Sequence, residues 1–239
     1  MSNRRKLLTL GIESPTNLFP ADTFDEVNQK VSRRTSGSKA AWHAFALAWN
    51  GIAYRFVAAI EYAGLFSGSI RINDAPPPDE RCRQENALFF CISSLQSSVE
   101  CTYFASRIVG GISSPDGFTP SCDQDLKFMP KDVVKYFGEH WPDSKICSVL
   151  RNAQSSREFI RICDLRRALF HRGSLPRQIF FSAGPSVKST ALPLNPTLPA
   201  DQWRYDFELT PSVLDPMVAW VDSHIGEAIV ALDEFTTAW

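Results

Sequence analysis

Residues 157–177 concentrate the side chains of this sequence that could do chemistry. They read REFIRICDLRRALFHRGSLPR and hold six arginines and one histidine against two acids, a local charge of +4. The whole chain has a net charge of −1, so any contact with nucleic acid would have to come from this local patch. Guanidinium groups bind phosphate, and an imidazole that titrates near neutral pH can move protons. The segment therefore indicates phosphate binding with acid–base chemistry.

Arg166 has an unusual place in the helix that this segment predicts. On a helical wheel with about 3.6 residues per turn, it falls within the apolar stripe that should face the core. Burying an unpaired charge is costly. We therefore expect Arg166 either to pair with a carboxylate on the preceding long helix, Glu100 or Glu85, or to bind an anionic ligand. In the first alternative the other arginines form a solvated face, and His171 caps the end of the helix.

The residues from Arg166 to His171 (RRALFH) match an R-x4-6-H motif, and the longer string LRRALFHRG is similar to LRN-x-L-x-HRG. On these residues the chain resembles the HEPN superfamily, the higher-eukaryote and prokaryote nucleotide-binding domains. The resemblance covers about residues 38–235 and implies a bundle of four to five helices, with the motif at the end of the third long helix. It implies a metal-independent endoribonuclease, or alternatively a non-catalytic module that binds RNA, nucleotide or a protein partner.

The resemblance also implies roles for individual residues. Arg166 would hold the scissile phosphate, and His171 would be the general base or acid on the ribose 2′-hydroxyl or the leaving oxygen, in a composite site of a homodimer. The phosphate-binding arginines would be Arg161, Arg167 and Arg172. Two acids are expected beside these arginines from their own placement in the sequence and not from the resemblance. Asp164, two residues before Arg166, would orient Arg167 or Arg161, and Glu100 would either position Arg166 for function or form a purely structural salt bridge with it. The products would be a 2′,3′-cyclic phosphate and a 5′-hydroxyl, and no metal or cofactor is expected because the nucleophile belongs to the RNA.

Three features depart from the family pattern. Catalytic members usually have Asn, Asp or His directly after the motif arginine, whereas this chain has Arg167, which cannot accept a hydrogen bond. Arg166 and His171 lie about 140° apart on an ideal helix, so they converge only where the helix ends near Phe170 or where two subunits meet. Gly173 stands where some antitoxin systems modify a tyrosine. The expected partners are RNA, a second copy of the chain and, in a toxin or defence setting, a protein partner or antitoxin.

The composition narrows the class of protein further. The chain has 239 residues, of which 44% are hydrophobic and 21% charged, as in an ordinary globular domain. Its six cysteines have no CxxC or Cys/His spacing, so we expect reduced thiols in a cytoplasmic protein and no structural zinc. No apolar run reaches the roughly 18–20 residues that span a bilayer, and no membrane contact is expected.

Apolar periodicity predicts the elements that position the motif. Spacings of three and four indicate long helices over residues 38–63, 83–109 and 144–170, and a last one from the signal at 211–212. The third helix is expected to break near Ala153, and Gly110–Gly111 to stop the second. His224 lies near the apolar stripe of the last helix, where a satisfied core histidine is the default interpretation.

Shorter elements complete the expected organisation. A short helix is predicted over residues 130–138, and a period of two at 177–182 and 202–209 predicts a β-hairpin or arm. Residues 1–36 are interpreted as an irregular, polar N-terminal extension. The sequence thus predicts a mainly α fold: a bundle of four to five long helices in one domain over residues 37–239, with a β insertion at about 175–209 before the last helix.

Overall fold

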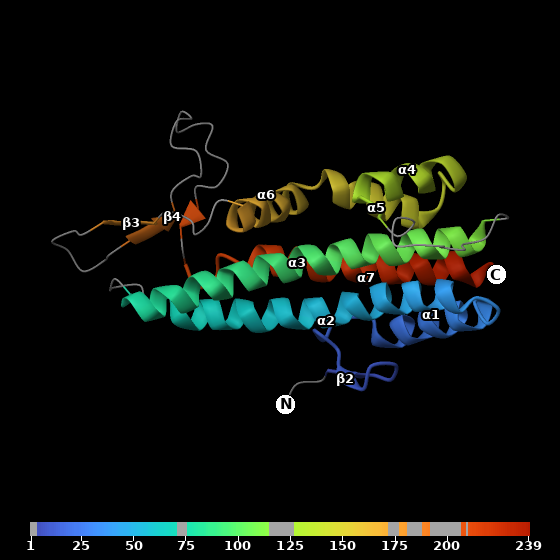
Figure 1. Cartoon of the computed structure of the whole chain (residues 1–239), viewed down its shortest axis with the longest axis horizontal. Coiled ribbons are helices and arrows are strands. Elements are labelled where there is room, and N and C mark those ends of the chain that lie inside the picture. The colour runs from blue at the N-terminus through green and yellow to red at the C-terminus, as the bar shows by residue number, and fades with distance from the viewer. Residues whose placement is uncertain are drawn as a thin grey trace.

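The computed structural model is an elongated bundle of helices (Figure 1). It describes the backbone of residues 4–70, 76–114, 127–171, 177–180, 188–191, 207–208 and 210–239, and the side chains of these residues outside 171–209. Three long helices run along the molecule: α2 (Lys39–Ser69), α3 (Pro78–Ser113) and α7 (Asp215–Thr237). The predicted mainly α architecture, with a small β element before the last helix, is confirmed.

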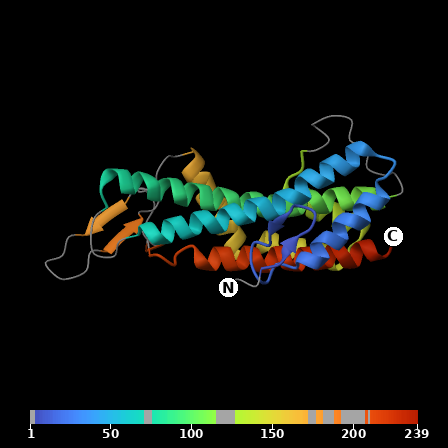
Figure 2. The same cartoon turned by 90° about the horizontal axis from the view of Figure 1, so that it is seen from below.

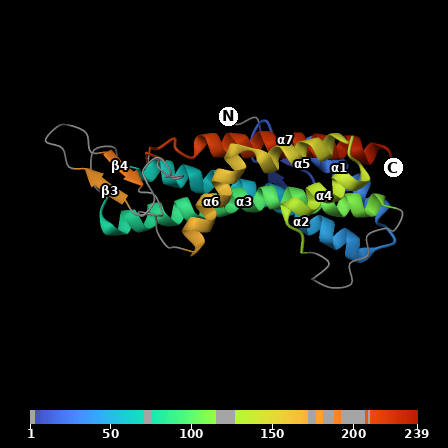
Figure 3. The same cartoon turned by 90° about the horizontal axis from the view of Figure 1, so that it is seen from above.

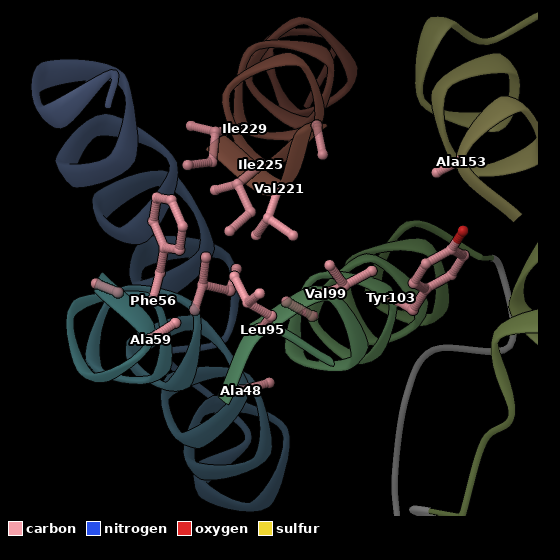
Figure 4. Close-up of a cluster of buried hydrophobic side chains, with 14 of the residues drawn as sticks. Ala48, Phe56, Ala59, Leu95, Val99, Tyr103, Ala153, Val221, Ile225 and Ile229 are labelled. Carbon is pink, nitrogen blue, oxygen red and sulfur yellow. The ribbon is translucent and has the colours of Figure 1, made fainter. Parts of the chain in front are cut away.

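The central core lies where α2, α3 and α7 face one another. Figure 4 shows Phe56 of α2, Leu95 and Val99 of α3, and Val221 and Ile225 of α7 pointing into the same space. All five side chains are fully buried, and each such burial stabilises the fold by about 1.5–3 kcal/mol. The predicted apolar stripes of these helices are therefore the faces that meet.

The start of α3 differs from the sequence expectation. The helix begins at Pro78, with Asp79 and Glu80 in its first turn, rather than near Arg83. A proline at the first helical position lacks only an N–H that would have no helical partner, and the two acids complement the positive end of the helix dipole. The row of prolines is thus the beginning of the helix as well as the end of the preceding connection.

The end of α3 also differs, because the helix continues through Gly110–Gly111 to Ser113. A Cβ atom at Gly110 would lie 3.0 Å from the Tyr136 ring, 3.2 Å from the Phe137 ring and 3.3 Å from the Trp141 ring. The expectation that these glycines stop the helix is wrong. Gly110 instead leaves room for the aromatic side chains that pack on α3.

Residues 21–34 were expected to be irregular, and they form a helix, α1 (Ala21–Arg34). Its buried residues include Phe24, Val27 and Val31, which recur at spacings of three and four. The Phe24 ring stacks on the Trp49 ring with centroids 4.6 Å apart, and Figure 2 shows α1 against α7. The expectation failed because the apolar stripe of α1 is narrow and interrupted by charged and polar residues.

A short hairpin precedes α1. Strands β1 (Lys6–Leu7) and β2 (Ile12–Glu13) pair antiparallel, and Gly11 in their turn has φ +69°, a value that favours glycine. The buried Asp25 carboxylate accepts hydrogen bonds from the backbone N–H groups of Leu8 and Thr9 at 2.8 and 3.1 Å. This carboxylate ties the hairpin to α1.

The second layer holds α4 (Pro130–His140), α5 (Lys145–Ser155) and α6 (Arg157–His171). The predicted short helix and the predicted break of the third long helix are both confirmed. The break lies at Ser156, between α5 and α6. The Ser156 hydroxyl caps the start of α6 by accepting a hydrogen bond from the Phe159 N–H at 3.1 Å. The buried Tyr103 hydroxyl of α3 donates to the Leu150 carbonyl at 2.7 Å. This bond holds α5 against α3, and α6 begins directly after the end of α5.

Three short strands lie between α6 and α7: β3 (Arg177–Phe180), β4 (Lys188–Ala191) and β5 (Phe207–Glu208). They form an antiparallel sheet in the order β3-β4-β5. Strand β4 (KSTA) was not predicted, because apolar and polar residues do not alternate in it. Of the second strand expected over residues 202–209, residues 202–206 lie outside the described residues. None of the described helices is both long and apolar enough to span a bilayer.

Candidate anion-binding site

Helix α6 crosses α3 (Figure 3). A cavity of about 460 Å³ opens beside α6, between it, α3 and the start of α4. We call it the α6 cavity. Its lining includes two arginines of α6, one lysine of α4 and two polar residues of α3: Arg166, Arg167, Lys131, Gln96 and Glu100. Phe159 and Cys163 of α6 also line it. Elements distant in the sequence therefore meet at the motif that sequence analysis singled out.

Arg166 lies on the flank of the buried face of α6 and is half-buried. The centre of that face is formed by Ile162, Leu165 and Leu169, so the expectation that Arg166 stands within the core stripe is wrong. The helix turns Leu165 into the core, and the next residue points about 100° away from it. The Arg166 Cζ atom lies 4.9 Å from the centroid of the Phe170 ring, a cation–π distance.

The structure brings Arg166 and Glu100 to the same cavity without pairing them. Among the described residues, no carboxylate oxygen lies within 4.0 Å of the Arg166 guanidinium nitrogens. Glu100 instead accepts a hydrogen bond from the Gln96 Nε2 atom at 2.6 Å. The salt bridge of the first sequence alternative is thus not formed, and the charge of Arg166 faces the cavity.

Asp164 contacts the other motif arginine. The Arg167 Nη1 atom donates to the Asp164 Oδ1 atom at 3.1 Å. The Asp164 side chain is 12% exposed and that of Arg167 is 67% exposed, so water screens the pair and it stabilises the fold by at most about 1 kcal/mol. The contact directs the Arg167 side chain along α6, at the edge of the cavity.

The other residues predicted for the site either lie outside the α6 cavity or fall outside the described residues. Arg161 is half-buried and is not among the residues that line the α6 cavity. Burial lowers the pKa of its guanidinium, Arg157 lowers it further, and Glu158 raises it. His171 is the last residue of α6, and its side chain, like the whole of Arg172, lies outside the described residues.

The cations that the cavity offers to an anion are side chains. In the first turn of α4, Pro130 has no N–H, and the N–H groups of Asp132 and Val133 donate to the Met129 carbonyl at 2.9 and 3.2 Å. The Lys131 side chain is exposed at this end of α4. Among the described residues, three cations and one carboxylate line the cavity, which favours a ligand with negative charge.

Cys163 contributes a thiol to the described lining of the cavity. Burial, with smaller contributions from Glu100 and Asp164, raises its pKa to about 11, although Arg167 and Arg166 act in the opposite direction. The thiol is therefore protonated at neutral pH and is a poor nucleophile. Within the described chain no group of three or more His, Cys, Asp and Glu side chains is placed to hold a metal ion.

Sequence analysis missed Gln96 and Lys131. Gln96 is only 8% exposed, and its Oε1 atom has no hydrogen-bond partner among the described residues. A signal was present, since a glutamine inside the apolar stripe of α3, one turn before Glu100, would need polar partners once buried. Lys131 carried no such signal, because only the packing of α4 against α3 and α6 places it there.

A second, smaller cavity of about 260 Å³ lies between α5 and α7 and is lined by Trp220, Ser223, His224 and Glu227 among others. His224 is buried as expected, and its ring stacks on the Trp220 ring with centroids 5.4 Å apart. Among the described residues its Nε2 atom has no hydrogen-bond partner, so the ring lies in the core as expected with one of its two nitrogens unpaired there. Burial lowers its pKa to about 4.

Comparisons of the chain with protein-family models, with curated proteins and with solved structures give no match. The resemblance to the HEPN superfamily therefore rests on the R-x4-6-H motif and on the order of the long helices.

Proposed function

We propose that this protein is a HEPN-like RNA-binding protein that cleaves RNA without a metal ion, using Arg166 and His171 in a composite homodimer site. The observation that carries the proposal is the half-buried Arg166, which lines the α6 cavity beside Arg167 and Lys131 and has no carboxylate partner among the described residues. Partial burial weakens the hydration of a cation, so an anionic ligand gains more there than on an open surface. The RNA phosphate is such a ligand.

In the proposed reaction the RNA supplies its own nucleophile. A histidine takes the proton of the 2′-hydroxyl, the 2′-oxygen bonds to phosphorus, and the bond from phosphorus to the 5′-oxygen breaks. A second proton carrier protonates that leaving oxygen, which gives a 2′,3′-cyclic phosphate and a 5′-hydroxyl. Arg166 would stabilise the charge that develops on the phosphate oxygens. Two subunits would supply two copies of His171 for the two proton transfers.

Aromatic side chains beside the motif support a partner surface at this end of α6. Phe170 is 56% exposed, and its ring stacks on the Phe89 ring with centroids 5.9 Å apart. Phe90, also exposed, stacks on the Tyr62 ring at 5.0 Å. Large exposed aromatic side chains that lie close together are typical of protein interfaces. A homodimer that covers them would bring two motifs near each other.

The alternative is a non-catalytic module that binds RNA, nucleotide or a protein partner. The observation that favours it is the Arg167–Asp164 ion pair. In catalytic members of the family that the motif resembles, the residue after the motif arginine is usually a hydrogen-bond acceptor. Here that residue is Arg167, a cation already paired with an acid. Phosphate binding would survive this change, whereas positioning of the reacting groups would not.

The test is RNA cleavage in the presence of EDTA. The native protein is compared with Arg166→Ala, His171→Ala and, as the matched control, Arg34→Ala, which removes an exposed arginine of α1. Circular dichroism confirms that each variant folds. We expect the native and Arg34→Ala proteins to cleave and the other two to be inactive. Binding without cleavage would establish the alternative, and cleavage that survives both motif substitutions would overturn the proposed site.

A further inference from the structure

Helix α2 lies at the edge of the bundle (Figure 1) and carries two apolar stripes. One stripe is buried in the core and includes Ile52 and Phe56. The other faces solvent, and we call it the outer stripe; it consists of Leu47, Gly51, Tyr54, Ala58 and Leu65. Its three large side chains, at positions 47, 54 and 65, are 77%, 50% and 62% exposed. A helix that is apolar on both sides is usually covered on both sides, so the outer stripe indicates a partner.

The outer stripe is continuous with the aromatic side chains beside the motif. Tyr62 lies one turn before Leu65 on the flank of the stripe that faces α3, and its ring stacks on the Phe90 ring with centroids 5.0 Å apart. The Phe90 ring contacts the Phe89 ring at 5.3 Å. The Phe89 ring in turn stacks on the Phe170 ring of α6 at 5.9 Å. A partner seated on the outer stripe therefore reaches the end of α6 that carries the motif.

The order of residues in the outer stripe is self-complementary. Leu47 and Leu65 lie nine residues on either side of Phe56, and Tyr54 and Ala58 lie two residues on either side of it. If two copies of α2 pair antiparallel about a two-fold axis at this level, Leu47 meets the partner's Leu65. The Tyr54 ring then faces the small side chain of the partner's Ala58, in both halves of the contact. A two-fold interface needs a surface that matches itself in this way.

Charge and size also favour a second copy as the partner. Between Leu47 and Leu65 the charged residues of α2 are one cation, Arg55, and one acid, Glu61. The stripe thus has no net charge that would repel its own copy. Helix α2 has 31 residues and is about 46 Å long and about 10 Å wide. With the exposed rings beside it, the face offers roughly the 600 Å² per subunit that the smaller stable interfaces bury.

We propose that the outer stripe is the homodimer interface, in which α2 pairs antiparallel with α2 of a second copy about a two-fold axis level with Phe56. The inference rests on the proposed function, which needs a homodimer, and names the surface that forms it. Gly51 and Tyr62, on one flank of the stripe, lie beside Cys101 and Phe90 of α3. In an antiparallel pair this flank is on the same side in both subunits. Both α3 helices, with their α6 cavities, therefore lie on one side of the dimer, as a composite site requires.

The experiment is sedimentation velocity of the full chain over a range of concentrations. The native protein is compared with Leu47→Glu and Leu65→Glu and with the matched control Leu18→Glu, which places the same charge on an exposed leucine outside the stripe. We expect the native and control proteins to be dimers. The dissociation constant should rise at least about 100-fold in the two stripe variants, because each charge enters the apolar interface twice. A native protein that is monomeric at about 100 μM, or stripe variants that dimerise like the native protein, would overturn the inference.

A combined variant tests the antiparallel register. Leu47→Lys and Leu65→Glu in the same chain place opposite charges across the interface, so this variant should recover dimerisation that Leu65→Glu alone loses. Circular dichroism checks that every variant folds. Failure of the combined variant to dimerise better than Leu65→Glu would overturn the antiparallel pairing.

RNA cleavage separates this inference from the proposed function. Arg166→Ala should remain a dimer and be inactive, whereas Leu65→Glu should be monomeric and inactive. Monomeric stripe variants that still cleave RNA would contradict the composite site and leave the interface standing. Stripe variants that stay dimeric, beside an inactive Arg166→Ala protein, would refute the interface and leave the proposed function standing.

Discussion

Replacing His224 with phenylalanine should remove a large part of the pH dependence of stability. The imidazole is 5% exposed, and burial lowers its pKa from 6.5 to about 4. The folded state therefore holds a neutral ring, while the unfolded chain begins to protonate this group near pH 6.5. The stabilisation is fully present above pH 6.5 and is lost as the pH falls toward 4. A difference of about 2.5 pKa units corresponds to about 3 kcal/mol.

The assay is urea unfolding of the native and His224→Phe proteins at pH 7, 6, 5 and 4, followed by tryptophan fluorescence. Phenylalanine keeps the stacking on Trp220 and cannot titrate. All the other ionisable groups are common to both proteins, so their contribution cancels in the difference between the two free energies of unfolding. This difference should shift by about 2 kcal/mol in favour of the variant between pH 7 and pH 5. A difference that stays constant over this range would refute the burial argument.

Two further predictions test the packing. Gly110→Ala should lower the free energy of unfolding by about 1–3 kcal/mol, because its Cβ would lie 3.0–3.3 Å from the rings of Tyr136, Phe137 and Trp141, in α4 and directly after it. Gly64→Ala, which meets no atom within 4 Å, should instead raise it by about 0.5–1 kcal/mol, and thermal unfolding of both variants checks the contrast. Asp25→Ala should cost about 1–3 kcal/mol by leaving the Leu8 and Thr9 N–H groups without an acceptor, and an unchanged urea midpoint would contradict this.

The sequence predicted the long helices well, because each buries one continuous apolar stripe whose period is visible without knowledge of its partner. Prediction from the sequence failed where the structure of a segment depends on the distant segment that packs against it. Gly110 looks like the end of a helix until the rings of α4 are placed against it. The helix α1 was missed because its three anchoring residues become meaningful only when Phe24 is seen to stack on Trp49.

Only some residues of the candidate site were predicted, because the others are brought there by contacts between distant segments. Helical spacing identified Arg166, and Glu100 was expected near it on the preceding long helix. The spacing placed the arginine in the core, however, because a helical wheel shows which residues share a face and not how wide the buried face is. Gln96 and Lys131 join the cavity only through the crossing of α6 over α3 and the approach of α4. Such contacts between distant segments leave no local pattern.

The most direct test of the account is the equilibrium binding of a fluorescently labelled RNA oligonucleotide in EDTA, measured by anisotropy. The account predicts that Arg166→Ala weakens binding about 10- to 100-fold, the effect of losing a charge-assisted hydrogen bond to phosphate. The control variant Arg34→Ala should bind like the native protein. If RNA binds the Arg166→Ala variant as tightly as it binds the native protein, the α6 cavity is not the phosphate site.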